Sequence, residues 1–261
     1  NAARRYAAIA MARDEASFSM AKAATVVPWR KRPSTILWVL SLGQLITWGL
    51  VYYTFPLFVV PMERELGWTR DQLYGALSAG LLVAGLCSIP VGAWIDRGHG
   101  RLLMTGGSIL AAALLVLWSQ VQTLPVFYLV WLGLGACQSV TLYEPAFAVI
   151  TRVYGPRYRQ AILIMTFLGG LASTFGIPFA QLLIERIAWR PTLEVMALII
   201  LAVGFLIHWL FVPGPSEVAV PIGEGPPVAS DKPRKSPLRA AVRVPAFWGL
   251  VVAFAGYGLA F

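Results

Sequence analysis

The sequence predicts an all-α membrane protein, and three observations support this: the composition, the length of the apolar runs and the placement of the charges. Of its 261 residues, 58% are hydrophobic and only 13% are charged. One soluble core of this size could not bury so much apolar surface. Several apolar runs reach the roughly 20 residues that a helix needs to cross the hydrocarbon core of a bilayer.

The apolar runs divide the chain into predicted spans. We place complete spans at residues 36–60, 73–95, 102–120, 126–151, 161–187 and 192–212, and the start of a seventh near Ala246. The predicted organisation is a cytoplasmic tail over 1–35, a six-helix transmembrane bundle over 36–212, a cytoplasmic linker over 213–244 and a seventh helix over 245–261. The linker is rich in Pro, Gly, Lys and Arg, which is typical of a solvated segment without a core.

The two ends of the chain carry expectations of their own. Residues 1–34 lack the apolar core and cleavage site of a secretory signal, so we expect the tail to stay in the cytosol. The chain begins with Asn1, whereas Met20 opens a more usual short basic tail; we therefore expect the first nineteen residues not to belong to the working protein. The seventh helix is still apolar at Phe261, which predicts a truncation there.

The basic residues fall in alternate loops. Of the 21 Lys and Arg residues, one side of the predicted membrane receives only four, Arg64, Arg70, Arg186 and Arg190, and the other side receives the rest. By the positive-inside rule, the amino terminus and the linker are cytoplasmic. We expect a multi-pass protein of the plasma, or inner, membrane. This arrangement explains the net charge of +9 without a nucleic-acid partner. The predicted partner of the basic residues is the lipid bilayer.

No residue pattern indicates an enzyme, a metal or a cofactor. Cys87 and Cys137 lie inside apolar runs, far apart, and are interpreted as small buried hydrophobic residues. There is no His-Glu-x-x-His motif, and the two histidines have no acidic neighbours at catalytic spacing.

Glu144 is the one acid deep within a predicted span. It precedes Arg152 by eight residues, which places it about 12 Å from the cytoplasmic end of its helix. A carboxylate at that depth is costly and is a functional candidate, able to carry a proton or to contact a solute. The alternative is a structural ion pair with an arginine of the cytoplasmic loops. Gln138, Thr141 and Glu144 step by three and predict a polar stripe along this helix.

The first predicted helix presents a mixed polar and aromatic face. Gln44, Trp48 and Tyr52 recur every four residues. Such a stripe is more often packing than a binding wall, but an amide needs hydrogen-bond partners that lipid cannot supply, so Gln44 favours a cavity. A mixed wall of this kind suits a small organic solute with a polar end.

The most specific motif lies between the second and third predicted spans, from Gly92 to Arg101. Its glycines accept backbone angles closed to other residues, and its arginines stay with water and anionic headgroups. The motif resembles the signature loop of the major facilitator superfamily, Gly-x-x-x-Asp-Arg/Lys-x-Gly-x-Arg/Lys, with Gly92, Asp96, Arg97 and Arg101 matching. The family's glycine position holds His99, and glycines flank it.

This resemblance implies a gating loop, a fold and a mode of action. The expected gating residues are Gly92, Asp96, Arg97, Gly100 and Arg101. In the family, two six-helix halves rock about a site near the midplane, and this chain would be the amino-terminal half, lacking its carboxy-terminal half. A sensor or scaffold on the same fold, without transport, is the alternative.

Further motifs are similar to the monocarboxylate and oxalate–formate branch of the superfamily. They are Glu65-Leu-Gly-Trp68, the stretch from Tyr143-Glu144-Pro-Ala-Phe through Arg159, and Gly169-Gly170-Leu-Ala-Ser173-Thr. The branch implies secondary active transport of a small organic solute, with a carboxylate as one candidate; substrate and coupling ion, proton or other, stay open. Because helices one and four line the cavity in this family, the expected substrate pathway is Gln44, Trp48, Tyr52, Gln138, Thr141 and Glu144.

Two remaining features also gain an interpretation from the resemblance. Small residues recur along the fifth predicted helix, at Gly169, Gly170, Ala172, Ser173, Gly176 and Ala180, and allow close helix contact. In the family this helix also lies against the other half. His208 lies in the sixth helix, which is peripheral, so a structural role is favoured over a pH switch.

Overall fold

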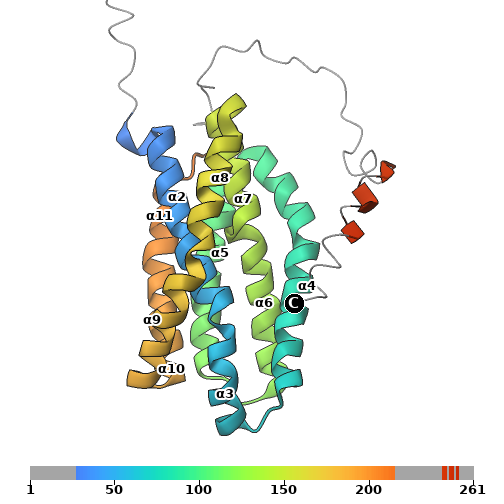
Figure 1. Ribbon diagram of the computed structural model, residues 1–261, viewed down its shortest axis with the longest axis vertical. Coiled ribbons are helices and arrows are strands. Elements are labelled where there is room, and N and C mark those ends of the chain that lie inside the picture. The colour runs from blue at the N-terminus through green and yellow to red at the C-terminus, as the bar shows by residue number, and fades with distance from the viewer. Residues whose placement is uncertain (1–27, 215–242, 246, 250, 253–261) are drawn as a thin grey trace, which may run out of the picture. The chain divides into compact units, whose positions relative to one another are not determined.

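A computed structural model describes residues 28–214, 243–245, 247–249 and 251–252, and every regular element in those ranges is helical (Figure 1). The chain divides into two compact units, Asn1–Gly223 and Glu224–Phe261. In the second unit, residues 245, 247–249 and 251–252 are helical, in the segment expected to hold a seventh helix. The predictions for residues 1–27, for most of the linker and for the rest of that segment lie outside the described residues.

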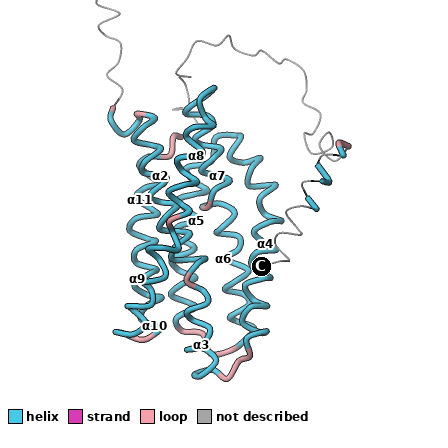
Figure 2. The backbone as a smooth tube through the Cα atoms, in the orientation of Figure 1, coloured by secondary structure: helices cyan, strands magenta, loops and turns pink. Residues whose placement is uncertain are grey.

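The helices of the first unit are joined by short loops (Figure 2). In chain order they are η1 (Trp29–Lys31), α2 (Pro33–Thr47), η2 (Trp48–Tyr53), α3 (Phe55–Leu66), α4 (Arg70–Trp94), η3 (Ile95–His99), α5 (Gly100–Ser119), α6 (Leu124–Thr141), α7 (Tyr143–Tyr154), η4 (Gly155–Arg157), α8 (Tyr158–Gly170), α9 (Ala172–Ile187), α10 (Trp189–Ile199), η5 (Ile200–Phe205) and α11 (Leu206–Phe211).

Four helical stretches in the described residues are long and apolar enough to cross a membrane: Pro33–Leu66, Arg70–Ser119, Leu124–Ile187 and Trp189–Phe211. The second and third contain 50 and 64 residues. Straight helices of those lengths would reach about 75 and 96 Å, far beyond a hydrocarbon core of about 30 Å. Both stretches instead double back, at Gly98 (φ +92°) and at Gly155 (φ +51°) (Figure 1).

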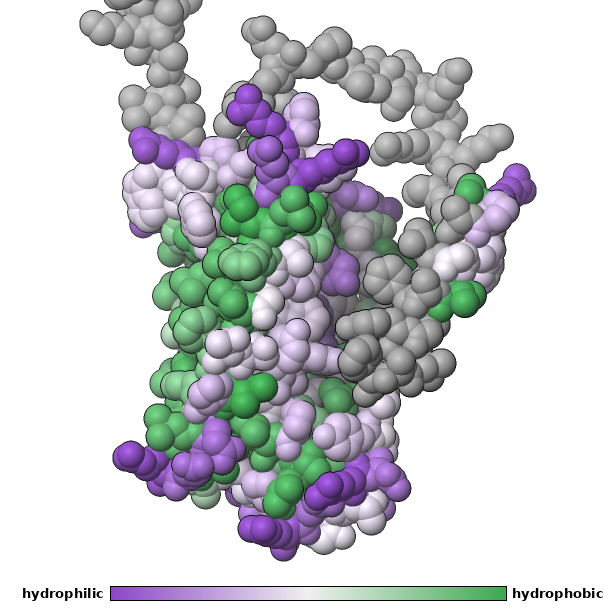
Figure 3. Space-filling model, in the orientation of Figure 1, coloured by the Kyte–Doolittle hydropathy of each residue, from purple (hydrophilic) through white to green (hydrophobic). Residues whose placement is uncertain are grey.

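The first unit has two polar ends and an apolar surface between them. One, the Asp96 end, contains η1, η3 and η4, and the other, the Arg190 end, contains the turns near Gly67, Val121 and Ala188. Figure 3 shows hydrophilic residues at both ends and, between them, hydrophobic residues along the left-hand side with residues of intermediate hydropathy in the middle. Leu82, Phe167 and Leu198 are more than 60% exposed on the outside of the helices. Such a surface belongs in lipid, because the helices satisfy their own backbone groups.

The interior has two apolar clusters separated by a polar layer. Aromatic side chains dominate the cluster nearer the Arg190 end, where Phe55 and Trp131 meet edge to face at 4.8 Å. The other cluster lies nearer the Asp96 end and contains Leu40, Met104 and Met165. Along the helices, buried polar residues fall between the two clusters: Ser41, Gln44, Thr105, Ser108, Gln138 and Thr141.

The predicted span 126–151 is wrong in one respect, because it is interrupted. At Leu142 the backbone is extended (φ −82°, ψ −153°), so α6 ends and α7 begins there. Pro145 fits the break, since it cannot donate to the carbonyl of Thr141 and its ring would clash with that carbonyl in a regular helix. Glu144 therefore does not continue the stripe of Gln138 and Thr141. The predicted span 161–187 is likewise interrupted, at Leu171.

Four of the six small residues named on α8 and α9 face inward. A Cβ atom on Gly176 would lie 2.7 Å from the Cα of Gly49 in η2, so only glycine permits this approach. Gly169, Ala172 and Ala180 are also buried, whereas Phe175 is 59% exposed. The four buried members therefore pack within the unit, which fits the interpretation of the stripe as close helix contact.

Candidate functional site

Gln44 joins α2 to the break between α6 and α7. Because Pro145 has no N–H, the carbonyl of Thr141 loses its usual partner four residues on. Gln44 is fully buried, and its Nε2 donates to the carbonyl oxygens of Thr141 at 2.9 Å and of Leu142 at 3.3 Å. The side-chain amide thus replaces the missing backbone donor and fixes α2 against the break.

Polar atoms without partners lie in the same layer. Among the described residues, Gln44 Oε1 and Gln138 Nε2 are buried and make no hydrogen bond. The Thr141 hydroxyl, in contrast, donates to the carbonyl of Cys137 at 2.8 Å. A buried amide group without a partner costs free energy, so this acceptor and this donor are available to a water or to a polar solute.

Glu144 lies exposed in the first turn of α7. The positive end of the helix dipole favours a carboxylate at that position. Within residues 28–214 Glu144 makes no ion pair, and Arg152, the arginine eight residues on, bonds with Asp96 instead. The described residues therefore do not form the structural pair that was the alternative interpretation of Glu144.

An aromatic group connects the first helix to α7. The ring of Trp48 lies 5.2 Å from that of Tyr52, 5.9 Å from Tyr53 and 5.2 Å from Tyr143, and Tyr143 stacks on Phe147 at 5.1 Å. Residues 48–53 form a π-helix, whose wider turn brings both tyrosines beside Trp48. The buried indole N–H of Trp48 has no partner among the described residues. Trp48 therefore lies near the break, because its ring contacts that of Tyr143, the first residue of α7.

The turn at Gly92–Arg101 depends on Gly98. Its φ of +92° is open to glycine and strained for other residues, whereas Gly100 has ordinary helical angles. Asp96 is 80% exposed, and the Arg152 guanidinium lies 3.9 Å from its carboxylate and also donates to its backbone carbonyl. Asp96 is thereby tied to α7, while Arg97 is exposed.

Arg101 lies on the carboxy-terminal side of the same turn. Its Nε donates to the carbonyl of Val212 at 2.7 Å, which joins the start of α5 to the end of α11. Gly100 is buried between Ile95, Val149 and Val212, and these residues lie beside a small pocket lined also by Arg152. The predicted gating residues therefore meet at one end of the unit, apart from Gly92, which lies one turn earlier in α4.

The structure adds a cluster at the Arg190 end that the sequence analysis missed. Arg190 Nε lies 2.8 Å from Glu65 Oε1, its NH2 donates to the carbonyl of Val121 at 3.0 Å, and its NH1 donates to that of Ser119. The indole N–H of Trp189 donates to Glu65 at 2.6 Å. This clamp joins α3, α5 and α10. Sequence analysis counted Arg190 only as a loop charge, because its partners are 69 to 125 residues away.

His208 has structural partners in the described chain. Its ring is 1% exposed, and Nδ1 lies 2.8 Å from Ser108 Oγ and 3.1 Å from the carbonyl of Met104. These contacts join α11 to α5 and fit the structural interpretation.

The apolar outer surface and the helices long enough to cross a bilayer are those of a multi-pass membrane protein. A comparison with protein families matches the chain to the Major Facilitator Superfamily over residues 40–261. The match covers most of the chain, so the protein belongs to this superfamily, whose members are transporters.

Proposed function

We propose that this protein is a secondary active transporter that moves a small organic solute by alternating access. The six proposed membrane crossings are α2 to α3, α4, α5, α6 to α7, α8 to α9, and α10 to α11. The turns at Gly98 and Gly155 support this division, as does the placement of arginines at the ends. The charge bias favours a cytoplasmic Asp96 end in a plasma, or inner, membrane.

The observation that carries the proposal is the break at Leu142 within the buried polar layer. The carboxylate of Glu144 lies there, exposed and without an ion pair within residues 28–214, and its neighbour Tyr143 is in contact with Trp48. Aromatic faces suit the apolar part of a solute, and Gln44 Oε1 and Gln138 Nε2, which have no partner among the described residues, suit its polar part. Glu144 would either titrate during the cycle or contact the solute.

The resemblance to the monocarboxylate and oxalate–formate branch supports a carboxylate as the solute. Within residues 28–214 every Lys and Arg lies at one of the two ends, and none lies in the polar layer. A cationic partner for a bound carboxylate would therefore come from outside these residues. Such a solute would be held by that cation on one side and by the aromatic group on the other.

Asp96 and Arg97 would act at the cytoplasmic gate. Arg152 ties η3 to α7 through Asp96, so this contact would hold the Asp96 end in one state of the cycle. Making and breaking one exposed ion pair costs little, which suits a contact that must form and release in each turnover.

Uptake by proteoliposomes containing the full-length protein tests the proposal, with radiolabelled monocarboxylates and their neutral amides as probes. Glu144→Gln should lower the uptake rate at least tenfold and remove its dependence on pH. Glu185→Gln is the control, because Glu185 is an exposed acid whose partner is Gln181 on the same helix. Unchanged uptake and pH dependence in Glu144→Gln would make Glu144 structural. Saturable binding of a probe without any uptake would favour a sensor.

A further inference from the structure

The Asp96 end presents exposed tryptophans beside basic residues. Trp29 is 56% exposed, and its ring meets Phe211 at 5.8 Å, edge to face. The Arg30 guanidinium lies 5.4 Å from the Trp29 ring. These contacts fix η1 against the end of α11, so its cations have a defined place on the unit.

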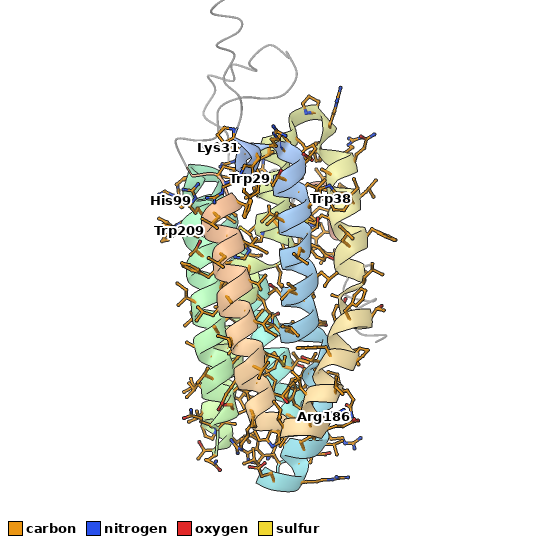
Figure 4. All side chains as sticks on the ribbon, turned by 90° about the vertical axis from the view of Figure 1, so that its left-hand side faces the viewer. Trp29, Lys31, Trp38, His99, Arg186 and Trp209 are labelled. Carbon is orange, nitrogen blue, oxygen red and sulfur yellow. The ribbon has the colours of Figure 1, made fainter. Side chains whose placement is uncertain are left out.

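Two further tryptophans lie at this end. Trp38 on α2 is 57% exposed, and Trp209 on α11 is 48% exposed and stacks on Phe205. Figure 4 shows Trp29, Lys31, Trp38 and Trp209 towards one end of the unit and Arg186 at the other. We call the surface formed by these three tryptophans with Arg30, Lys31 and Arg32 the tryptophan shelf. Indole rings favour the boundary between hydrocarbon and headgroups, which sets the shelf at that level.

The charges around the shelf favour an anion. The sequences of η1, α2 and α11 contain no acid, and the described acid at this end of the unit is Asp96, next to Arg152. The Arg190 end differs, because its four arginines are accompanied by five acids: Glu63, Glu65, Asp71, Glu185 and Glu194. There, the indole of Trp189 is buried and donates to Glu65.

We propose that the tryptophan shelf binds the headgroup of an anionic phospholipid. Guanidinium groups match the geometry of a phosphate and can bind it with two parallel hydrogen bonds. The three indoles would lie against the glycerol and the first part of the acyl chains. Because the tryptophans are exposed on the apolar outside of the helices, the shelf suits a phosphate that is attached to acyl chains rather than free phosphate.

Native mass spectrometry of the full-length protein in detergent tests this site, with phosphatidylglycerol, phosphatidylcholine and inorganic phosphate as probes. Arg30→Gln with Arg32→Gln should weaken phosphatidylglycerol binding about twenty-five-fold, from about fivefold for each basic residue near an anionic headgroup. Arg157→Gln with Arg159→Gln is the matched control. It removes the same charge from two exposed residues at the same end that do not belong to the shelf, and should change binding less than threefold.

Trp29→Ala tests the contact of the indole with the lipid separately from the charge of the arginines. It should weaken the binding of phosphatidylglycerol and phosphatidylcholine by similar factors, since the indole contacts parts that both lipids share. The proposal is overturned if the two double variants weaken phosphatidylglycerol equally, if the wild-type protein binds both lipids equally, or if inorganic phosphate displaces the lipid. All variants lie on the surface, and an unchanged melting temperature confirms that they fold.

Discussion

Replacing Gln44 tests whether its amide substitutes for the N–H group that Pro145 lacks. Gln44→Leu keeps the approximate volume but removes the donor to the carbonyls of Thr141 and Leu142. A buried carbonyl without a partner costs about 1–3 kcal/mol. Hydrogen bonds between membrane helices average only about 0.6 kcal/mol, and the leucine also removes the unpaired Oε1. We therefore expect unfolding free energy to fall by about 1–2 kcal/mol.

The assay is a double-mutant cycle of unfolding in mixed micelles, with Pro145→Ala as the second change. Alanine restores a backbone N–H four residues after Thr141, so Gln44→Leu should cost less in that background, with a coupling of at least about 0.5 kcal/mol. Gln138→Leu is the control, because the Gln138 Nε2 has no partner to lose; it should leave stability unchanged or raise it. Additive effects of Gln44→Leu and Pro145→Ala would refute the reasoning.

Three further predictions concern the two ends of the unit. Gly98→Ala should lower stability by about 1–2 kcal/mol, because φ there is +92°, whereas Gly100→Ala, at ordinary helical angles, should change it by less than about 0.5 kcal/mol in the same unfolding assay. Asp96→Asn should slow uptake severalfold at equal membrane abundance; wild-type rates would count against a gating role. Arg190→Gln should lower unfolding free energy by about 2 kcal/mol through loss of its charged hydrogen bonds, and an effect no larger than that of the exposed Arg186→Gln would contradict the clamp.

The sequence contains the proline beside the break, but it does not identify the residue that bonds to the freed carbonyl of Thr141. A proline lacks the N–H group and its ring clashes with the carbonyl four residues back, so local chemistry weakens the helix before Pro145. Pro61, Pro90 and Pro178 lie inside continuous helices, so packing decides whether a proline interrupts the helix. The predicted stripe of Gln138, Thr141 and Glu144 failed because it assumed a regular helix through that proline. The partner that takes the freed carbonyl is 97 residues away in the chain, and only the packing of α2 against the break identifies it as Gln44.

The sequence by itself determined the class of this protein. The class follows from local patterns: apolar runs long enough to cross a bilayer, arginines at the ends of those runs, and the motif from Gly92 to Arg101. These patterns favour membrane insertion however the helices pack against one another. The family match over residues 40–261 confirms the superfamily. The tertiary structure decided which residues meet: Gln44 with Thr141, Arg190 with Glu65, and Gly176 with Gly49. Those contacts join helices far apart in the sequence, and any helix of similar hydrophobicity could have supplied a partner, so only three-dimensional packing selects among them.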